Sequence, residues 1–207
     1  MKLSRRTLVI VISAVLLIFD QVVKILIKTN FALGESVNVI GNWFQLAFIE
    51  NKGMAFGMAF GGNVGKYILV LLRIALVIIL SIYLRRLLKR PATPTGVLVG
   101  ITLIIVGACG NIIDCLFYGP LFSESTYSQV AQFLPPGGGY APVGLGKVVD
   151  MLYFPLIDTI MPSWVPFWGG ERFVFFQPVF NVADSCITCG AIYLILFHWK
   201  FFSVIEK

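Results

Sequence analysis

Two amide–carboxylate pairs in this sequence have the spacing of neighbours on a helix. Asp114 lies three residues after Asn111, and Asp184 lies three residues after Asn181. Residues at i and i+3 share a helix face, so each pair predicts an amide beside a carboxylate. A further acid, Asp150, lies in the stretch GKVVDMLYF. Two carboxylates held close together keep one proton near neutral pH, so one can activate water while the other polarises a carbonyl. These side chains therefore suit amide-bond hydrolysis by paired acids.

Other reactive groups give weaker signals. Asp20 and Lys24 are four residues apart and are predicted to pair on one helix, either within a site or as a plain interface salt bridge. The single histidine, His198, belongs to no Ser-His-Asp set and is expected to be an interfacial anchor. Thiols in apolar stretches behave as small hydrophobic groups, so a zinc or redox site is the less favoured reading. We therefore expect no metal and no cofactor. The cysteines are Cys109, Cys115, Cys186 and Cys189.

The elements that would position these groups are membrane-spanning helices. The chain of 207 residues is 58% hydrophobic and 13% charged, with a mean hydropathy of +0.90. Four windows are long enough to cross a bilayer core, which needs about 20 apolar residues. They cover residues 7–27, 66–84, 95–113 and 179–197. No series of alternating ten-residue segments indicates a membrane barrel. The fold class predicted is an α-helical membrane protein with four transmembrane helices in one membrane domain, 1–207.

Charge placement predicts the orientation of these spans. Nine of the 16 Lys and Arg residues flank the start of the first window and the ends of the second and fourth. Segments rich in Lys and Arg next to spans stay in the cytoplasm, so both termini are predicted to be cytoplasmic. Residues 28–65 and 114–178 then face outward. The net charge of +6 is thus a topology signal, and we expect no nucleic-acid partner. The first window is interpreted as a retained span, because it is too long for a signal peptide and no cleavage motif follows.

The outer segments carry two distinct patterns. VNVIGNWFQLAFIENKGMAFG combines β-branched and aromatic residues with two turn signals, which predicts a small β-cradle on the membrane. The later segment contains the irregular stretch PPGGGYAP and then WVPFWGGERFVFFQP. Its aromatic residues favour an interfacial belt over a substrate lip, and residues 162–171 are predicted to form a lid or a membrane-resting brace. Most of the candidate acids collect at the outer edge of the spans, where buried charge is costly and indicates function.

Five motifs in order resemble those of the lipoprotein signal peptidases, or signal peptidase II. They are Asp20-Gln21-x-x-Lys24, Asn51-x-Gly53-x-Ala55-Phe56-Gly57, Gly110-Asn111-x-x-Asp114, Val148-Val149-Asp150 and Phe180-Asn181-x-Ala183-Asp184.

The resemblance implies an aspartyl endopeptidase of the bacterial inner membrane, with its active site at the periplasmic edge. Such an enzyme removes the signal peptide from prolipoproteins whose cysteine already carries diacylglycerol, and cuts before that cysteine. Its partners would be that substrate and membrane lipids, and we expect a monomer. The resemblance makes Asp150 and Asp184 the catalytic pair. The residues expected to bind substrate or support the pair are Asp20, Lys24, Asn51, Gly53, Asn111, Asp114, Asn181 and Ala183.

The sequence departs from the family pattern in two ways. Cys115 stands where family members usually have arginine, and Arg73 in the second window is a candidate substitute, although snorkelling or helix packing would also explain it. The segments on either side of Asp150 are also longer than usual, so Asp114 with Asp184 remains an alternative catalytic pair.

A second class of function also fits the acids. A small proton-coupled transporter could use Asp20, Asp114 and Asp184 as a relay. Transporters commonly show internal repeats and interrupted spans, which this sequence lacks. We therefore favour the peptidase over the transporter, and both over a purely structural scaffold.

Overall fold

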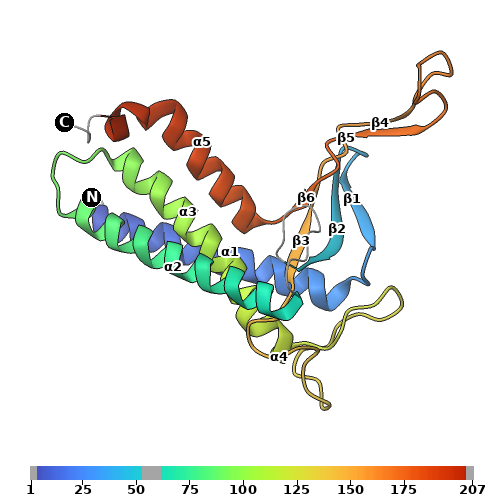
Figure 1. The fold of residues 1–207 in the computed structure, drawn as a ribbon, viewed down its shortest axis with the longest axis horizontal. Coiled ribbons are helices and arrows are strands. Elements are labelled where there is room, and N and C mark those ends of the chain that lie inside the picture. Colours follow the sequence, from blue (N-terminus) through green and yellow to red (C-terminus); the bar gives the residue numbers. More distant parts are fainter. Residues whose placement is uncertain (1–3, 53–61, 204–207) are drawn as a thin grey trace.

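Four long helices and two small antiparallel sheets make up the computed structural model, which describes residues 4–52 and 62–203. The long helices are α1 (Arg5–Asn30), α2 (Gly62–Leu88), α3 (Thr95–Ile113) and α5 (Val182–Ser203). Each is long and apolar enough to cross a membrane. The helices form a bundle in which α3 packs against α1, α2 and α5, while the sheets stand at one end of the bundle (Figure 1). The protein is therefore a multi-pass membrane protein.

The third helix does not end at Ile113, as the sequence window suggested. It continues through a π-helical turn, η2 (Asp114–Tyr118), into α4 (Gly119–Leu121). Pro120 lacks an N–H, so the carbonyl of Leu116 loses its partner four residues ahead. That carbonyl accepts a hydrogen bond from Gly144 instead, and the neighbouring Cys115 carbonyl accepts one from Gly146 at 2.8 Å. These bonds lay the chain that leads to residue 150 directly along the helix extension.

The close packing of α3 against its neighbours depends on glycine. A Cβ added at Gly107 would lie 2.2 Å from the carbonyl oxygen of Ala183 in α5. At Gly110, it would lie 2.5 Å from Oδ2 of Asp20 in α1. Small residues at such contacts let membrane helices approach closely. The two glycines therefore bring the starts and ends of three helices together at the end of the bundle where the sheet lies.

The main sheet joins strands from both outer segments. Its order is β1-β2-β3-β6, and every neighbouring pair is antiparallel. A β-cradle was expected from the first outer segment alone, but β3 and β6 come from the second. The strands are β1 (Ser36–Ile40), β2 (Phe44–Asn51), β3 (Val148–Tyr153) and β6 (Val179–Phe180). Because residues 179 and 180 pair with β3, the last helix begins at Val182 and not at 179, where the hydrophobic window began.

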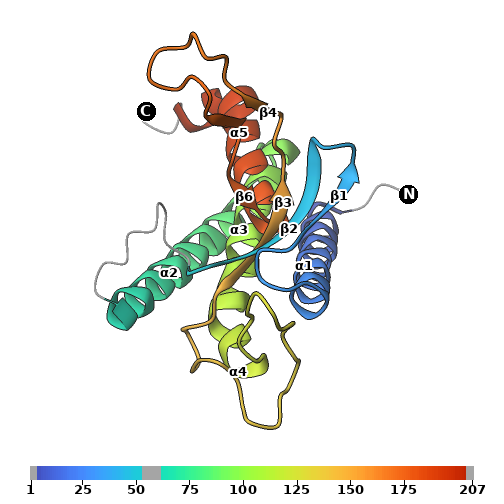
Figure 2. The same ribbon diagram turned by 90° about the vertical axis from the view of Figure 1, so that its right-hand side faces the viewer.

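A separate ribbon of two strands extends from the main sheet. Strands β4 (Ile157–Ile160) and β5 (Arg172–Phe175) pair only with each other among the described strands. Viewed onto the sheet, this ribbon and the loop after α4 extend in opposite directions (Figure 2). The stretch PPGGGYAP lies in that loop and forms no helix or strand.

The sheet is fixed to the bundle by one apolar cluster. Phe48 of β2 and both Val149 and Met151 of β3 are fully buried against Ile27 of α1 and Tyr118 of η2. Asp150 lies between Val149 and Met151 in β3, so its side chain points to the opposite face of the strand. Docking of β3 therefore places an acid at the junction of sheet and helices.

Candidate active site

Lys24 is the centre of a buried charge cluster at that junction. Its Nζ lies 3.1 Å from Oδ2 of Asp20 and 2.7 Å from Oδ2 of Asp114. All three side chains are almost fully buried. Nζ also donates a hydrogen bond to Oδ1 of Asn111 at 2.9 Å. Buried charges persist only when they are paired and hydrogen-bonded, and this cluster meets both conditions. It ties α1 rigidly to the end of α3.

Asn111 and Asn181 connect the cluster to the other two acids. An ammonium group can only donate, so the bond from Lys24 turns the Asn111 oxygen toward it and the Asn111 amide N–H toward Asp184. That Nδ2 lies 2.7 Å from Oδ1 of Asp184. The Nδ2 of Asn181 lies 2.7 Å from Oδ1 of Asp150 and 3.2 Å from Oδ1 of Asn111. A continuous chain of hydrogen bonds thus joins the two carboxylates.

The first turn of α5 holds Asp184 in place. Asn181 caps this helix, since its Oδ1 accepts from the backbone N–H of Asp184 at 2.8 Å. The Ala183 N–H donates to Oδ1 of Asp20, also at 2.8 Å. A carboxylate at a helix N-terminus is stabilised by the free N–H groups and the helix dipole. Asp20 therefore has two roles, pairing with Lys24 and seating the helix that carries Asp184.

Asp150 is buried on β3 and has an unusual affinity for its proton. Burial, followed by the nearby charge of Asp184, raises the pKa of Asp150 from 3.8 to about 7. Hydrogen bonds from Asn181 and from Asn51 on β2 act in the opposite direction on this pKa. The electrostatic influence of Asp184 shows that the two acids lie near each other. A carboxyl group with such a pKa can take up or release its proton near neutral pH.

The structure brings together all but one of the site residues expected from the sequence. Asp114, the alternative catalytic acid, accepts from Lys24 and, at 3.0 Å, from the amide of Gln21. Its Oδ2 also faces the N–H of Val149 at 3.4 Å, so Asp114 holds β3 against the bundle. Gly53 lies outside the described residues. Of the transporter's relay acids, Asp20 and Asp114 share one lysine, which leaves neither as a free carrier.

A second charged cluster was not expected from the sequence. Glu50 precedes Asn51, and its buried side chain pairs with Lys28 and with Lys147, the latter at 2.9 Å. Burial alone would raise the pKa of Glu50, but the two lysines lower it below the usual range. Ser125 donates a hydrogen bond to the same carboxylate at 2.9 Å. Lys28 follows Lys24 by four residues, one helical turn away, and this spacing is the signal that could have revealed the cluster.

Arg73 and Cys115 face each other between α2 and the helix extension. Nη1 of Arg73 lies 3.9 Å from Sγ of Cys115. The guanidinium thus reaches the position where the expected family pattern has an arginine. All four cysteines are free. Within residues 4–52 and 62–203, no three His, Cys, Asp or Glu side chains are grouped as a metal site would require.

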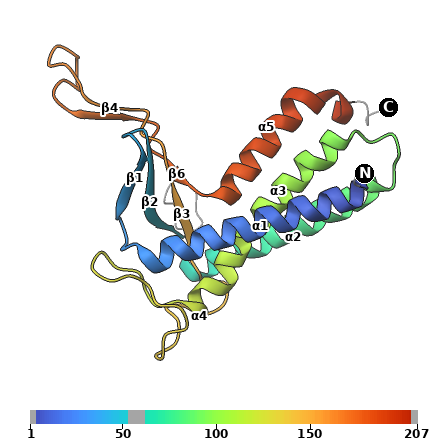
Figure 3. The same ribbon diagram turned by 180° about the vertical axis from the view of Figure 1, so that it is seen from behind.

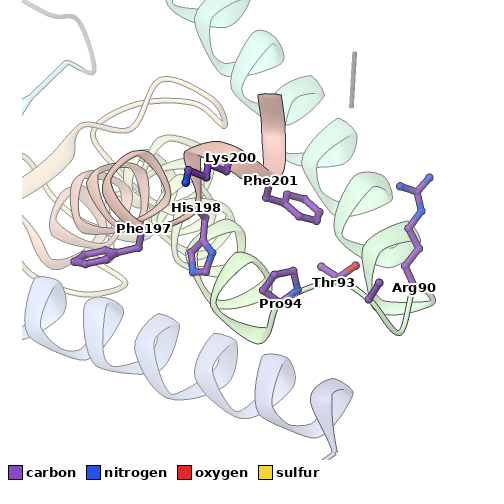
Figure 4. Close-up of a pocket in the computed structure, with 8 residues that line it drawn as sticks. Arg90, Thr93, Pro94, Phe197, His198, Lys200 and Phe201 are labelled. Carbon is purple, nitrogen blue, oxygen red and sulfur yellow. The ribbon is translucent and has the colours of Figure 1, made fainter. Parts of the chain in front are cut away.

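The opposite end of the bundle contains a cavity without acids. It has a volume of about 550 Å³ and lies between the start of α3 and the end of α5 (Figure 4). Its lining includes Arg90, His198 and Phe201, and the residues described as lining it include no carboxylate. His198 Nε2 lies 3.3 Å from Oη of Tyr193. This cavity therefore offers no pair of acids for hydrolysis.

Comparisons with known proteins identify the family of this chain. Residues 12–200 match the family model described as "Signal peptidase (SPase) II". The lipoprotein signal peptidase of Porphyromonas gingivalis is 47% identical over 94% of this chain and 84% of its own length. That of Amoebophilus asiaticus is 34% identical over 89% of this chain and 75% of its own length. A solved structure described as a bacterial membrane enzyme, determined by the in meso method at 2.3 Å resolution, superposes with a TM-score of 0.57 at 26% identity, covering 94% of this chain and 89% of that one. The chain belongs to the signal peptidase II family.

Proposed function

We propose that this protein is a membrane aspartyl endopeptidase that removes the signal peptide from lipid-modified prolipoproteins and cuts before the lipid-bearing cysteine. Membership of the signal peptidase II family and the relatives named lipoprotein signal peptidase support this activity. Asp150 and Asp184 are the proposed catalytic acids. The substrate class follows from those relatives, and the assignment of the acids follows from the site.

One observation supports the catalytic pair above others. Asp150 and Asp184 come from a strand and a helix, yet one chain of hydrogen bonds through Asn181 and Asn111 connects them. Burial and the charge of Asp184 raise the pKa of Asp150 to about 7. By contrast, Asp20 and Asp114 are both engaged with Lys24. In the described part of the chain, neither acid of the first pair forms a salt bridge, so both are available to exchange protons with water.

The chemistry requires one proton shared by the two acids. In the proposed step, Asp184 takes a proton from a water molecule placed between the carboxyl groups, and the oxygen of that water attacks the scissile carbonyl. Asp150 donates a hydrogen bond and then its proton to the carbonyl oxygen. The C–N bond of the tetrahedral intermediate breaks as Asp184 gives its proton to the leaving amine and a hydroxyl of the intermediate returns a proton to Asp150. Water is consumed, and the pair again holds one proton.

The surrounding residues position the two acids and the substrate. Lys24, through Asn111, orients the amide that Asp184 faces. Asn51 lies at the end of β2 next to β3, where it can hold substrate backbone as well as hydrogen-bond Asp150. Gly53 is proposed to contribute to substrate binding.

The proposed orientation puts the sheet outside the cytoplasm of a bacterial inner-membrane protein. The start of α1 and the end of α5 lie at the end of the bundle away from the sheet (Figure 1). Basic residues gather at that end, including Arg85 and Arg86 at the end of α2. Such segments remain cytoplasmic. The acids would then meet a substrate that arrives laterally through the bilayer with its lipid still embedded. A monomer suffices, because one chain supplies every proposed site residue.

The test uses purified protein in lipid nanodiscs. Asp150→Asn and Asp184→Asn should each reduce cleavage of a diacylglyceryl-modified precursor at least a thousandfold, while the exposed Asp158→Asn retains full activity. The precursor without its lipid should be a poor substrate, and mass spectrometry of the products should place the cut before the modified cysteine. Cleavage by either site variant at the rate of the parent protein would disprove the assignment of that acid.

A further inference from the structure

The ribbon formed by β4 and β5 packs extensively on no other helix or strand among the residues that the structure describes. We call residues 156–176 the arm. Its strands pair from Ile157 with Phe175 to Ile160 with Arg172, and it projects beyond the main sheet (Figures 1 and 2). An isolated two-stranded ribbon is marginally stable in water. A surface that covers one side of the arm would therefore stabilise it.

The register of the arm makes it amphipathic. Alternate residues of a strand point to opposite faces. One face carries an apolar row that Trp168 extends, because its ring stacks on Phe173 with centroids 6.5 Å apart. The strand residues of this face are Ile157, Thr159, Phe173 and Phe175. The opposite face carries an ion pair between Asp158 and Arg172, together with Val174 and Ile160. All the strand charges of the ribbon thus lie on one face, and the other face is aromatic and aliphatic apart from Thr159.

The tip of the arm exposes large aromatic side chains. Phe167 is 98% exposed, Trp164 is 78% exposed and Trp168 is 56% exposed. A contiguous apolar patch of this kind marks an interaction surface. Tryptophan in particular settles at the membrane–water boundary, where its ring is buried and its N–H stays hydrated. The composition of the tip therefore favours lipid headgroups over a dry protein partner.

The position of the arm places it where a bilayer ends. Four helices of the same chain are long and apolar enough to cross the membrane, and the sheet lies at the end of that bundle (Figure 1). Seen from the front and from behind, the arm extends sideways from the bundle axis, on the side of α5 (Figures 1 and 3). A bilayer that surrounds the four helices would therefore extend beneath the arm.

We infer that the arm is a membrane-docking element whose apolar face lies in the phospholipid headgroup layer next to α5. Its charged face, with Asp158 and Arg172, then points to water. Interfacial elements bind by this combination of a buried apolar face and a hydrated polar face. The occupant of the surface is the bilayer in which the protein already resides.

Docking of the arm would act on the two acids, a consequence that rests on the proposed function. The arm leaves the sheet after Tyr153 and returns at Val179, and these two residues pair with each other. Asp150 precedes this base and Asp184 follows it. Phe154 fixes the base by stacking on Phe44 with centroids 4.7 Å apart. Binding of the arm to the headgroup layer would therefore fix the distance between the two acids and the membrane surface in which the lipid of the substrate is embedded.

Spin labels on the two faces of the arm test the docking directly. In a variant with all four cysteines replaced by alanine, a nitroxide is attached to Thr159→Cys or to the adjacent Ile160→Cys. Both labels are measured in phosphatidylethanolamine–phosphatidylglycerol nanodiscs. The ratio of accessibility to oxygen over accessibility to a water-soluble nickel chelate should be at least fivefold higher for the label at 159 than for the label at 160. Equal exposure of both labels to the chelate would show that the arm stands in water and would overturn the inference. Shielding of both from both reagents would show a protein-covered arm and overturn it equally.

A second measurement avoids the cysteine-free background. Phospholipids brominated near the headgroup should quench a large share of the tryptophan fluorescence of the otherwise unaltered protein, and that share should fall in Trp164→Ser/Trp168→Ser. An unchanged quenched share would contradict docking whether or not the protein is active. For the effect on the acids, the same double variant should cleave at least fivefold more slowly in bilayers and at the parental rate in detergent micelles. An equal loss of cleavage rate in bilayers and in micelles would show that the arm only supports the fold. If the parent protein cleaved no precursor in either setting, only the proposed function would be refuted.

Discussion

Replacing the buried acid on β3 should make the protein more stable while destroying its proposed activity. Raising the pKa of Asp150 from 3.8 to about 7 costs the folded state about 4 kcal/mol above pH 7, at about 1.36 kcal/mol per pH unit. An asparagine side chain at this position carries no titrating proton and can still accept the hydrogen bond from Asn181. Asp150→Asn should therefore remove this cost. For a chain of this length, 1 kcal/mol corresponds to about 2–4 °C in Tm, so we expect a rise of about 10 °C at pH 8.

The sign of the pH dependence separates this mechanism from a general effect of the substitution. Because the folded-state pKa is raised, the folded protein holds a proton between about pH 4 and pH 7 that the unfolded chain has lost. The parent protein should lose stability as pH rises through this interval and level off above it. The stability difference between Asp150→Asn and the parent should thus be smaller at pH 5 and reach a plateau above about pH 7.5.

Thermal unfolding in nanodiscs between pH 5 and pH 8.5, followed by intrinsic fluorescence, measures this difference. The exposed Asp158→Asn is the matched control, since its carboxylate is ionised throughout the interval and its surface ion pair contributes little. A Tm of Asp150→Asn equal to or below that of the parent across the whole range would refute the argument. So would a gain that does not vary with pH.

Two further substitutions test the supports of the site. Lys24→Met leaves two buried carboxylates without their cation, which should cost about 3–5 kcal/mol of stability and lower Tm by at least 8 °C. Lys52→Met, at an exposed position, is the control and should leave Tm unchanged. A small loss of Tm in both variants would show that the buried cluster contributes little. Gly107→Ala places a methyl group 2.2 Å from the Ala183 carbonyl oxygen, so it should push α3 and α5 apart, cost about 1–3 kcal/mol and reduce cleavage at least tenfold. Gly137→Ala, which meets nothing within 4 Å, is its control, and equal activity of the two variants would argue against a requirement for close helix packing.

The sequence allowed the spans and the helix-borne pairs to be predicted because both depend on local spacing. Asn111 and Asp114 do lie on one helical segment, and both contact Lys24. The end of that helix was misplaced because hydrophobicity falls at Asp114 while the hydrogen-bonded helix continues to Leu121. A polar residue whose side chain is paired with a neighbouring helix does not end its own helix. A hydrophobic window contains no information about such pairing.

The meeting of Asp150 with Asp184 could not be predicted from spacing. It requires β3 to pair with β2, whose residues lie about a hundred positions earlier, as in the pairing of Val148 with Asn51. Such non-local pairing leaves no local signal. The contact of Lys147 with Glu50 could not be predicted for the same reason, because Lys147 reaches Glu50 from the far end of a long loop. The aromatic segment was recognised by composition, but its strand register, and so its two chemically different faces, appears only in the structure.

The division of the two acids between a strand and the final helix has a consequence for biogenesis. Chains emerge from the ribosome with their N-terminal part first, so Asp150 is made before the span that begins at Val182. A nascent chain shorter than 184 residues lacks the second acid, and a longer one can unite the two only when the last span has inserted beside α3. Under the proposed function, the ability to hydrolyse substrate therefore arises only at the last step of membrane insertion.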